Sequence, residues 1–210
     1  MDLKKKTIEY RKIDIKNLEI RSSDNGDMIV EGYATTFNNP YVLWRDGDYT
    51  VMEQVDPDAF NGADMKDVIM QYDHEGRVFA RIRNKTLEVV PDGHGLFVRA
   101  FLGGTELGRQ LYEEIKGGYT DRMSFGFTVS ADERKEEKDA DGKITVTRTI
   151  KQIGKLYDVS AVSIPANDAT EISARSFADG VIREAMEEAH AIEVRRQNIQ
   201  KIKILIDLED

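Results

Sequence analysis

The 210-residue chain contains no cysteine, which excludes disulfide bonds, a thiol nucleophile and thiolate metal sites. Its three histidines, His74, His94 and His190, lie far apart in the sequence and offer little material for a histidine-based metal site. No apolar run approaches the ~18 residues that span a bilayer, and no apolar core follows the charged N-terminal residues. We therefore expect no cofactor, no metal, no membrane segment and no secretion signal.

The chain also has fewer basic than acidic residues. The chain carries 30 lysines and arginines against 39 aspartates and glutamates, for a net charge of -9. An acidic surface repels phosphates, so nucleic acid is not an expected partner. With 40% hydrophobic residues, the chain suits one globular domain of ordinary size with a tail.

Strand patterns dominate residues 7–165. Apolar residues alternate over 7–21, and further short apolar runs follow, separated by turn signals. One clear helix is predicted over 106–116, where Leu107, Leu111 and Ile115 share a face and Thr105 precedes as a cap. Strands without regular helix alternation favour an antiparallel barrel or sandwich.

Three further segments have distinct patterns. Residues 56–60 begin with Asp-Pro and predict a short helix. Residues 132–142 are charged and lack large apolar residues, which predicts a mobile surface loop. From Asp179 onward, apolar residues recur every three or four positions and predict a long amphipathic helix. That helix either packs on its own domain or docks a partner, so we divide the chain into a domain of 1–175 and a tail of 176–210.

Ser124 lies in an apolar strand between Met123 and Phe125. Alternate residues of a strand share a face, so Ser124 lies with Gly126 and Thr128 on a small, polar side that leaves room for a ligand. A nucleophilic serine needs a neighbouring base. Without one, Ser124 is an ordinary strand serine that faces solvent.

Two other positions supply the remaining parts of a Ser-His-acid set. His74 directly follows an apolar run and could act as a general base, or it is a surface histidine satisfied by its neighbours. Asp158 lies within a strand of small and apolar residues. A carboxylate there needs a partner if it is buried and could orient a histidine, or it is an edge-strand charge. Spacing alone leaves a hydrolase possible and gives no distances.

Two ordered motifs identify a family. GGYTDRMSFGF at 117–127 and KLYDVSAVSIPANDA at 155–169 follow a histidine that ends an apolar strand. Together with the N-terminal segments EGYA and VDPDAF, they resemble the prohead proteases of tailed phages, which are capsid-maturation serine proteases distantly related to herpesvirus assemblin. The resemblance covers about residues 28–176. It departs at Asp73, where the family has asparagine, at Ala80, where glycine is expected, and at Asp158, where glutamate is common.

The resemblance implies a herpesvirus-protease-like fold, mainly β, with a closed or nearly closed β-barrel surrounded by helices. It implies that Ser124 is the nucleophile, His74 the general base and Asp158 the residue that orients His74. The oxyanion donor is left open between backbone N–H groups near Ser124 and an arginine such as Arg122.

The implied partners are the phage scaffold protein or the scaffold segment of the major capsid protein. The enzyme would cut them inside the immature prohead, in the cytoplasm of the bacterial host, and prophage encoding fits equally. Self-cleavage is typical of such proteases, and the tail of 176–210 is a natural place for it. We also expect the chain to associate with copies of itself. The alternative function is a non-catalytic capsid-assembly or scaffold-binding protein on the same fold. A ligand-binding β-barrel, with a wide apolar pocket, is supported by strand content alone.

Overall fold

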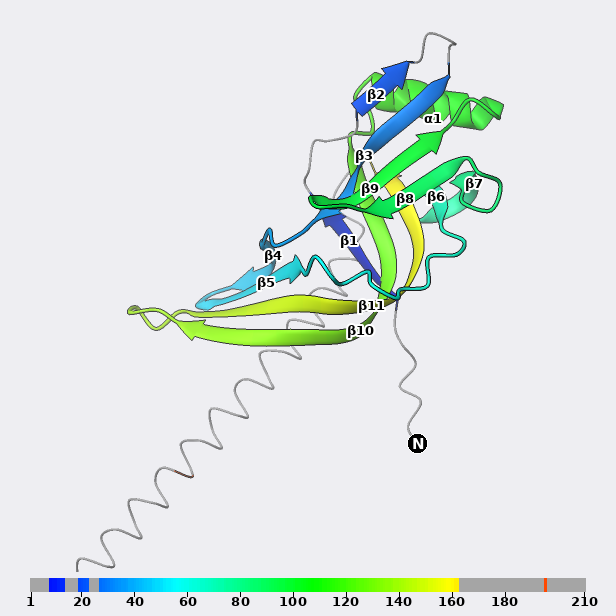
Figure 1. Ribbon diagram of the computed structural model, residues 1–210. Helices are drawn as coiled ribbons and strands as arrows, with labels where there is room; N and C mark the ends of the chain where they lie inside the picture. Colours follow the sequence, from blue (N-terminus) through cyan, green and yellow to red (C-terminus); the bar gives the residue numbers. More distant parts are fainter. Residues whose placement is uncertain (1–7, 14–18, 23–26, 163–194, 196–210) are drawn as a thin grey trace, which may run out of the picture.

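The computed structural model describes residues 8–13, 19–22, 27–162 and Arg195 (Figure 1). Within these residues the chain is mainly β, with two sheets and one α-helix of defined bounds, α1 (Glu106–Lys116). The strands in chain order are β1 (Glu9–Ile13), β2 (Glu19–Ser22), β3 (Met28–Thr36), β4 (Tyr41–Asp46), β5 (Tyr49–Val55), β6 (Ile69–Tyr72), β7 (Glu75–Arg81), β8 (Leu87–Pro91), β9 (Gly95–Phe101), β10 (Arg122–Lys138) and β11 (Ile144–Val162).

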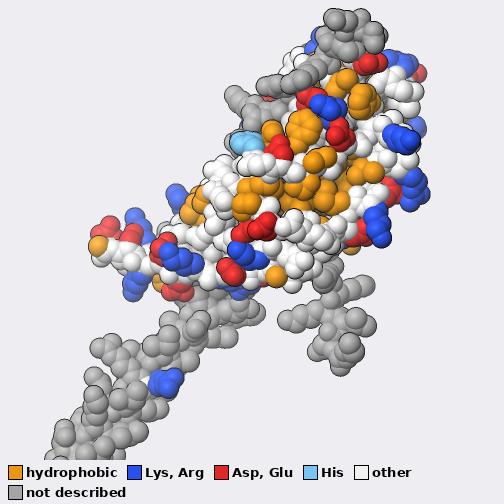
Figure 2. Space-filling model, viewed as in Figure 1, with side chains coloured by type: hydrophobic (Ala, Val, Ile, Leu, Met, Phe, Trp, Pro, Cys, Tyr) orange, Lys and Arg blue, Asp and Glu red, His pale blue; other side chains and the backbone are white. Residues whose placement is uncertain are grey.

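The first sheet is built on the long antiparallel hairpin of β10 and β11. β1 pairs with β10 on one side, and β11 pairs in parallel with two different strands on the other. β5 lies beside residues 144–150 of β11, whereas β6 lies beside residues 158–161. β4 then pairs with β5, and β7 with β6. The turn end of the hairpin extends to one side of the molecule, where charged side chains of both signs gather (Figures 1 and 2).

The second sheet has the order β2-β3-β9-β8, and α1 packs against β3 of this sheet and against β7. The apolar faces of both sheets and of α1 share one core. Its fully buried large side chains include Met70, Leu96, Leu102, Phe125, Phe127 and Leu156. The core therefore reaches the two phenylalanines that flank Gly126 in β10 and fixes the position of that strand.

The predicted helix over 106–116 is confirmed by α1. Thr105 caps it, because its hydroxyl accepts a hydrogen bond from the Gly108 N–H at 3.0 Å. Leu111 and Ile115 are buried as the spacing requires, while Leu107 remains 38% exposed. The helix ends at a two-glycine turn in which Gly118 has a φ of 74°.

The expected closed barrel surrounded by helices is wrong. A barrel has no free edges, but the described strands form two open sheets, and the first ends in β1 on one side and β4 on the other. The physical reason lies in β11, which changes neighbours along its length and so makes the sheet branch where a barrel would close. α1 is the one helix in the described part of residues 8–162, so no ring of helices surrounds the strands there.

Two local predictions are also wrong. Residues 132–138, expected in a mobile loop, continue β10, because each pairs with a residue of β11 between 144 and 150. The side chains of 133–138 are exposed, whereas Asp132 is half-buried and accepts a hydrogen bond from Arg148. The turn is confined to the short segment before Ile144, where Gly142 has a φ of 87°. Residues 56–60 form turns instead of a helix.

The predicted C-terminal helix and the 175/176 domain boundary lie outside the described residues, apart from Arg195. Across the described part of the chain, no helix combines the length and apolar character needed to cross a membrane.

Candidate active site

Strand pairing brings Ser124, His74 and Asp158 together. β11 carries Asp158 and lies between β10, which carries Ser124, and β6, which ends just before His74. In the β10–β11 register, Ser124 is opposite Ser160, and Gly126 is opposite Asp158. Three residues that are distant in sequence therefore meet across three neighbouring strands.

The imidazole of His74 contacts both other side chains. Its Nε2 lies 2.5 Å from the Ser124 Oγ, and its Nδ1 lies 2.5 Å from Asp158 Oδ1. The side chains of His74 and Asp158 are only 10% and 6% exposed, and Ser124 is fully buried. Each ring nitrogen thus has one oxygen partner in a site from which water is largely excluded.

A tight turn aims His74 back over the sheet. Tyr72 pairs with Glu75, so Asp73 and His74 are the two central residues of the β6–β7 hairpin. Both have left-handed backbones, with φ values of 47° and 63°, which is the geometry of a type I′ turn. Histidine and aspartate tolerate this region better than most residues other than glycine, although it still costs free energy. The turn is anchored by a hydrogen bond from the Asp73 N–H to the Ala161 carbonyl at 3.1 Å.

Two small residues of β10 and β11 hold Asp158. The Ser160 hydroxyl donates to Asp158 Oδ1 at 2.8 Å. Gly126 leaves the space that the carboxylate fills, since a Cβ atom at this position would lie 2.3 Å from Asp158 Oδ2 and 2.8 Å from Tyr10 Cε1. The sequence placed Gly126 on the small face of its strand but gave no sign that a carboxylate fills that space.

β1 covers the site. The Tyr10 ring packs on the His74 ring, with centroids 4.4 Å apart, and the Ser124 hydroxyl donates to the Arg11 carbonyl oxygen at 2.8 Å. Burial, and then the charge of Asp158, raises the pKa of Tyr10. The single hydroxyl hydrogen of Ser124 has two acceptors within reach, the Arg11 carbonyl and His74 Nε2. β1 therefore competes with the histidine for that hydrogen, a role that the strand pattern over 7–21 did not indicate.

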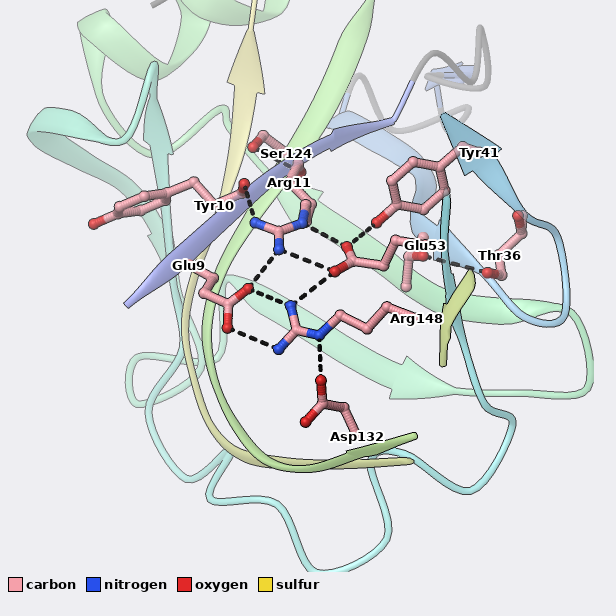
Figure 3. A network of polar contacts seen from close by, with 10 residues as sticks. Glu9, Tyr10, Arg11, Thr36, Tyr41, Glu53, Ser124, Asp132 and Arg148 are labelled. Carbon is pink, nitrogen blue, oxygen red and sulfur yellow. Dashed lines mark hydrogen bonds and ion pairs between the residues drawn. The ribbon is translucent and has the colours of Figure 1, made fainter. Parts of the chain in front are cut away.

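A second polar cluster lies on the other face of β1 (Figure 3). We call it the ionic cluster; it contains Glu9, Arg11, Tyr41, Glu53, Asp132 and Arg148. The fully buried Glu53 carboxylate accepts from Arg11 Nε at 2.5 Å and Nη2 at 3.0 Å, from Arg148 Nη1 at 2.9 Å and from the Tyr41 hydroxyl at 2.5 Å. Arg148 also contacts Glu9 and Asp132, at 2.8 and 2.7 Å.

Charge pairing decides the protonation of this cluster. Burial alone raises the pKa of Glu53, but Arg11 and Arg148 outweigh burial and hold that pKa below its ordinary value. Burial and the neighbouring Glu53 charge hold the pKa of Tyr41 well above its ordinary value, so its hydroxyl remains a donor. The cluster was missed from sequence because its members come from five separate segments with no shared motif.

The other histidines are elsewhere. His94 packs edge-on against Tyr33, with ring centroids 4.6 Å apart, and His190 lies outside the described residues. Among the residues that the structure describes, no group of three or more histidine, aspartate or glutamate side chains is arranged to hold a metal ion.

A serine, a histidine and a carboxylate joined in this order form an arrangement typical of serine hydrolases. Comparison with known sequences shows which family of serine hydrolases the chain belongs to. Residues 16–192 match the family described as caudovirus prohead serine protease, and the chain belongs to that family. It is therefore a serine protease of the prohead type.

A sequence relative agrees with this assignment. The chain is 29% identical over 180 residues to the prohead protease of Enterobacteria phage HK97, covering 84% of this chain and 71% of that protein. The solved structure of the bacteriophage T4 capsid assembly protease covers 74% of this chain and 96% of its own, with 14% identity. The TM-score of that comparison is 0.37. β1 precedes the span that matches the family.

Proposed function

We propose that the chain is an endopeptidase that cuts the scaffold protein, or the scaffold segment of the major capsid protein, during prohead maturation. Ser124 is the nucleophile, His74 the general base and Asp158 the residue that orients His74. The observation that carries the proposal is the pair of 2.5 Å contacts made by the two His74 nitrogens, one to Ser124 and one to Asp158. Family membership supports the type of substrate.

Each step follows from these contacts. His74 Nε2 takes the hydroxyl proton as Ser124 Oγ bonds to the carbonyl carbon of the substrate. The peptide C–N bond then breaks, and His74 returns the proton to the leaving amine. Water hydrolyses the resulting ester by the same route and releases the new carboxyl end and free Ser124. Asp158 accepts the Nδ1–H throughout and stabilises the imidazolium that forms at each step.

Location and assembly follow from the same proposal. The protease acts inside the immature prohead in the bacterial host, where scaffold and capsid proteins are concentrated. It associates with further copies of itself there and also cuts itself, with the tail of 176–210 as the proposed site of that cut.

The test is co-expression of the full chain with a phage scaffold protein and a major capsid protein, followed by mass spectrometry of the products. Ser124→Ala is expected to abolish new termini in all three proteins. Ser130→Ala removes an exposed hydroxyl from the same strand and is expected to process normally. Equal processing by Ser124→Ala and the unmodified chain would refute the proposal. If no variant processes any protein although scaffold binding persists, the non-catalytic scaffold-binding function is the correct one.

A further inference from the structure

β1 lies where an extended peptide would bind. It is the edge strand of the first sheet and pairs antiparallel with β10, with Lys12 opposite Ser124 and Arg11 opposite Phe125. Its Arg11 carbonyl oxygen contacts the Ser124 Oγ at 2.8 Å. Peptides often bind by adding a strand to a sheet edge, where main-chain bonds provide affinity and side-chain pockets provide specificity. A substrate that reaches the buried Ser124 would therefore take the place of β1 and use the pockets that β1 now fills.

The β1 residue whose carbonyl contacts Ser124 is Arg11, and its side chain enters the ionic cluster on the opposite face of β1. Arg11 presents two nitrogens to the two oxygens of Glu53, Nε to Oε1 at 2.5 Å and Nη2 to Oε2 at 3.0 Å. Its guanidinium carbon lies 5.7 Å from the centre of the Phe127 ring. Figure 3 shows the Arg11 guanidinium between Glu53 and Glu9. A planar fork matched to a carboxylate and placed over an aromatic ring is the geometry that distinguishes arginine from other residues.

Removing β1 takes away one of the two guanidinium partners of Glu53. β1 supplies Glu9 and Arg11, and the groups that stay in the ionic cluster are Glu53, Arg148 and Asp132. Asp132 also forms an ion pair with the partly exposed Arg134 at 3.7 Å, so the buried carboxylate that loses a partner is Glu53. Without Arg11, Glu53 Oε1 keeps only the Tyr41 hydroxyl, although Glu53 is fully buried. A buried carboxylate with a missing partner is costly, so the pocket favours a cationic occupant and disfavours an acidic one.

We propose that Glu53, with Tyr41 and Phe127, forms a specificity subsite that takes an arginine side chain of the substrate. The arginine is the residue immediately before the cleaved bond, because the residue whose side chain enters the pocket is the one whose carbonyl reaches Ser124. Lysine is the second choice, since a single ammonium cannot match both Glu53 oxygens. This subsite rests on the proposed function of Ser124, His74 and Asp158.

β1 occupies the proposed substrate position, but its Arg11 carbonyl is not oriented for attack by Ser124. The oxygen of the Arg11 carbonyl faces the Ser124 hydroxyl in a hydrogen bond, whereas cleavage requires the Ser124 Oγ to approach the carbonyl carbon. A substrate arginine would occupy the same pocket with its carbonyl turned, so that the hydroxyl hydrogen is left to His74.

The test compares matched peptides. The full chain is incubated with a degenerate library of 14-residue peptides, and cut bonds are mapped by mass spectrometry. Arginine is expected immediately before most cut bonds, and kcat/KM for one well-cut peptide is expected to fall by about 100-fold when that arginine becomes glutamine. Equal cutting of the arginine and glutamine peptides, or a preference for an acidic residue, would overturn the subsite.

Substitutions of buried glutamates test whether Glu53 causes the preference for arginine. Glu53→Gln is expected to reduce the arginine-over-glutamine ratio to below about tenfold. Glu31→Gln changes another buried carboxylate, which pairs with Arg99 in the second sheet, and is expected to keep the full ratio. If Glu53→Gln does not fold, the ratio measured on the unmodified chain decides the question.

Binding provides a readout that needs no catalysis. Ser124→Ala is titrated into a labelled peptide of sequence EYRKI and into a second peptide in which glutamine replaces the arginine. Tighter binding of the arginine peptide by about tenfold or more supports the subsite, and equal binding or no binding of either overturns it. Cutting that persists in Ser124→Ala would refute the proposed function itself, whereas Ser124-dependent cutting without a basic preference refutes the subsite alone.

Discussion

Two polar clusters lie against the two faces of β1, and they are built in opposite ways. On one face, Tyr10 packs on the chain of contacts from Ser124 through His74 to Asp158, which contains one acidic side chain. On the other face, Arg11 is one of four charged side chains that form a network with the fully buried Glu53.

The difference predicts separate roles. The Ser124 hydroxyl can be removed without leaving a buried charge unpaired, so the fold should tolerate the change although the chemistry does not. Removing any central member of the ionic cluster leaves a buried charge without its partner, so the fold should suffer directly. The first cluster is expected to set activity, and the second to set stability and substrate choice.

The largest expected effect on stability comes from Glu53→Ala. This substitution leaves the buried Arg11 and Arg148 without the carboxylate that they share. We therefore expect the free energy of unfolding to fall by about 3–5 kcal/mol. Chemical denaturation followed by circular dichroism measures it. Glu136→Ala removes an exposed carboxylate of β10 as the control and should cause no measurable change. A Glu53→Ala protein as stable as the control would mean that the ionic cluster does not support the fold.

A smaller effect on stability is expected from Gly126→Ala, which should also lower activity. The added methyl would lie 2.3 Å from Asp158 Oδ2, so the carboxylate or Tyr10 must move. We expect a loss of about 1–3 kcal/mol in stability from overpacking and a fall in kcat of about 100-fold from misplacement of His74.

Gly104→Ala is the matched control for that substitution, because nothing lies within 4 Å of its added Cβ. Unchanged kcat in Gly126→Ala, with stability equal to that of Gly104→Ala, would show that Asp158 does not fill the space above Gly126.

The smallest effect is a pH dependence that belongs to Glu53. Its pKa in the folded protein lies below the ordinary value of 4.5, so its stabilisation is complete above about pH 4.5 and is lost as the pH falls through the folded-state pKa. The difference in unfolding free energy between the unmodified chain and Glu53→Gln should therefore shrink between pH 5 and pH 3, as measured by denaturation at each pH. A constant difference across this range would contradict the assigned direction.

Sequence reasoning reached the first cluster and missed the second, for physical reasons. Motifs of the family led to Ser124, His74 and Asp158, although residue spacing alone could not bring them together. The strand register does so, with β11 placed between β10 and β6. The family assignment and α1 were predicted correctly. Spacing was sufficient for α1 because a helix depends on contacts three and four residues apart.

The errors concern contacts between distant segments. Nothing in the local pattern around Arg11 or Glu53 shows that they meet, because charged residues in strands usually face solvent. Closure of a barrel depends on which strands are neighbours, and the change of partner along β11 leaves no local signal in the sequence. The charged segment 132–138 was assigned to a loop because it lacks large apolar residues, whereas its pairing with β11 needs only backbone groups.

The most direct test of the account measures activity and stability on the same two samples, Ser124→Ala and the unmodified chain. Cleavage of one well-cut peptide gives kcat/KM, and chemical denaturation gives the free energy of unfolding. The account predicts that Ser124→Ala loses at least about 1,000-fold in kcat/KM while its unfolding free energy stays within about 1 kcal/mol. Cleavage at the same bond and a similar rate by Ser124→Ala would contradict it.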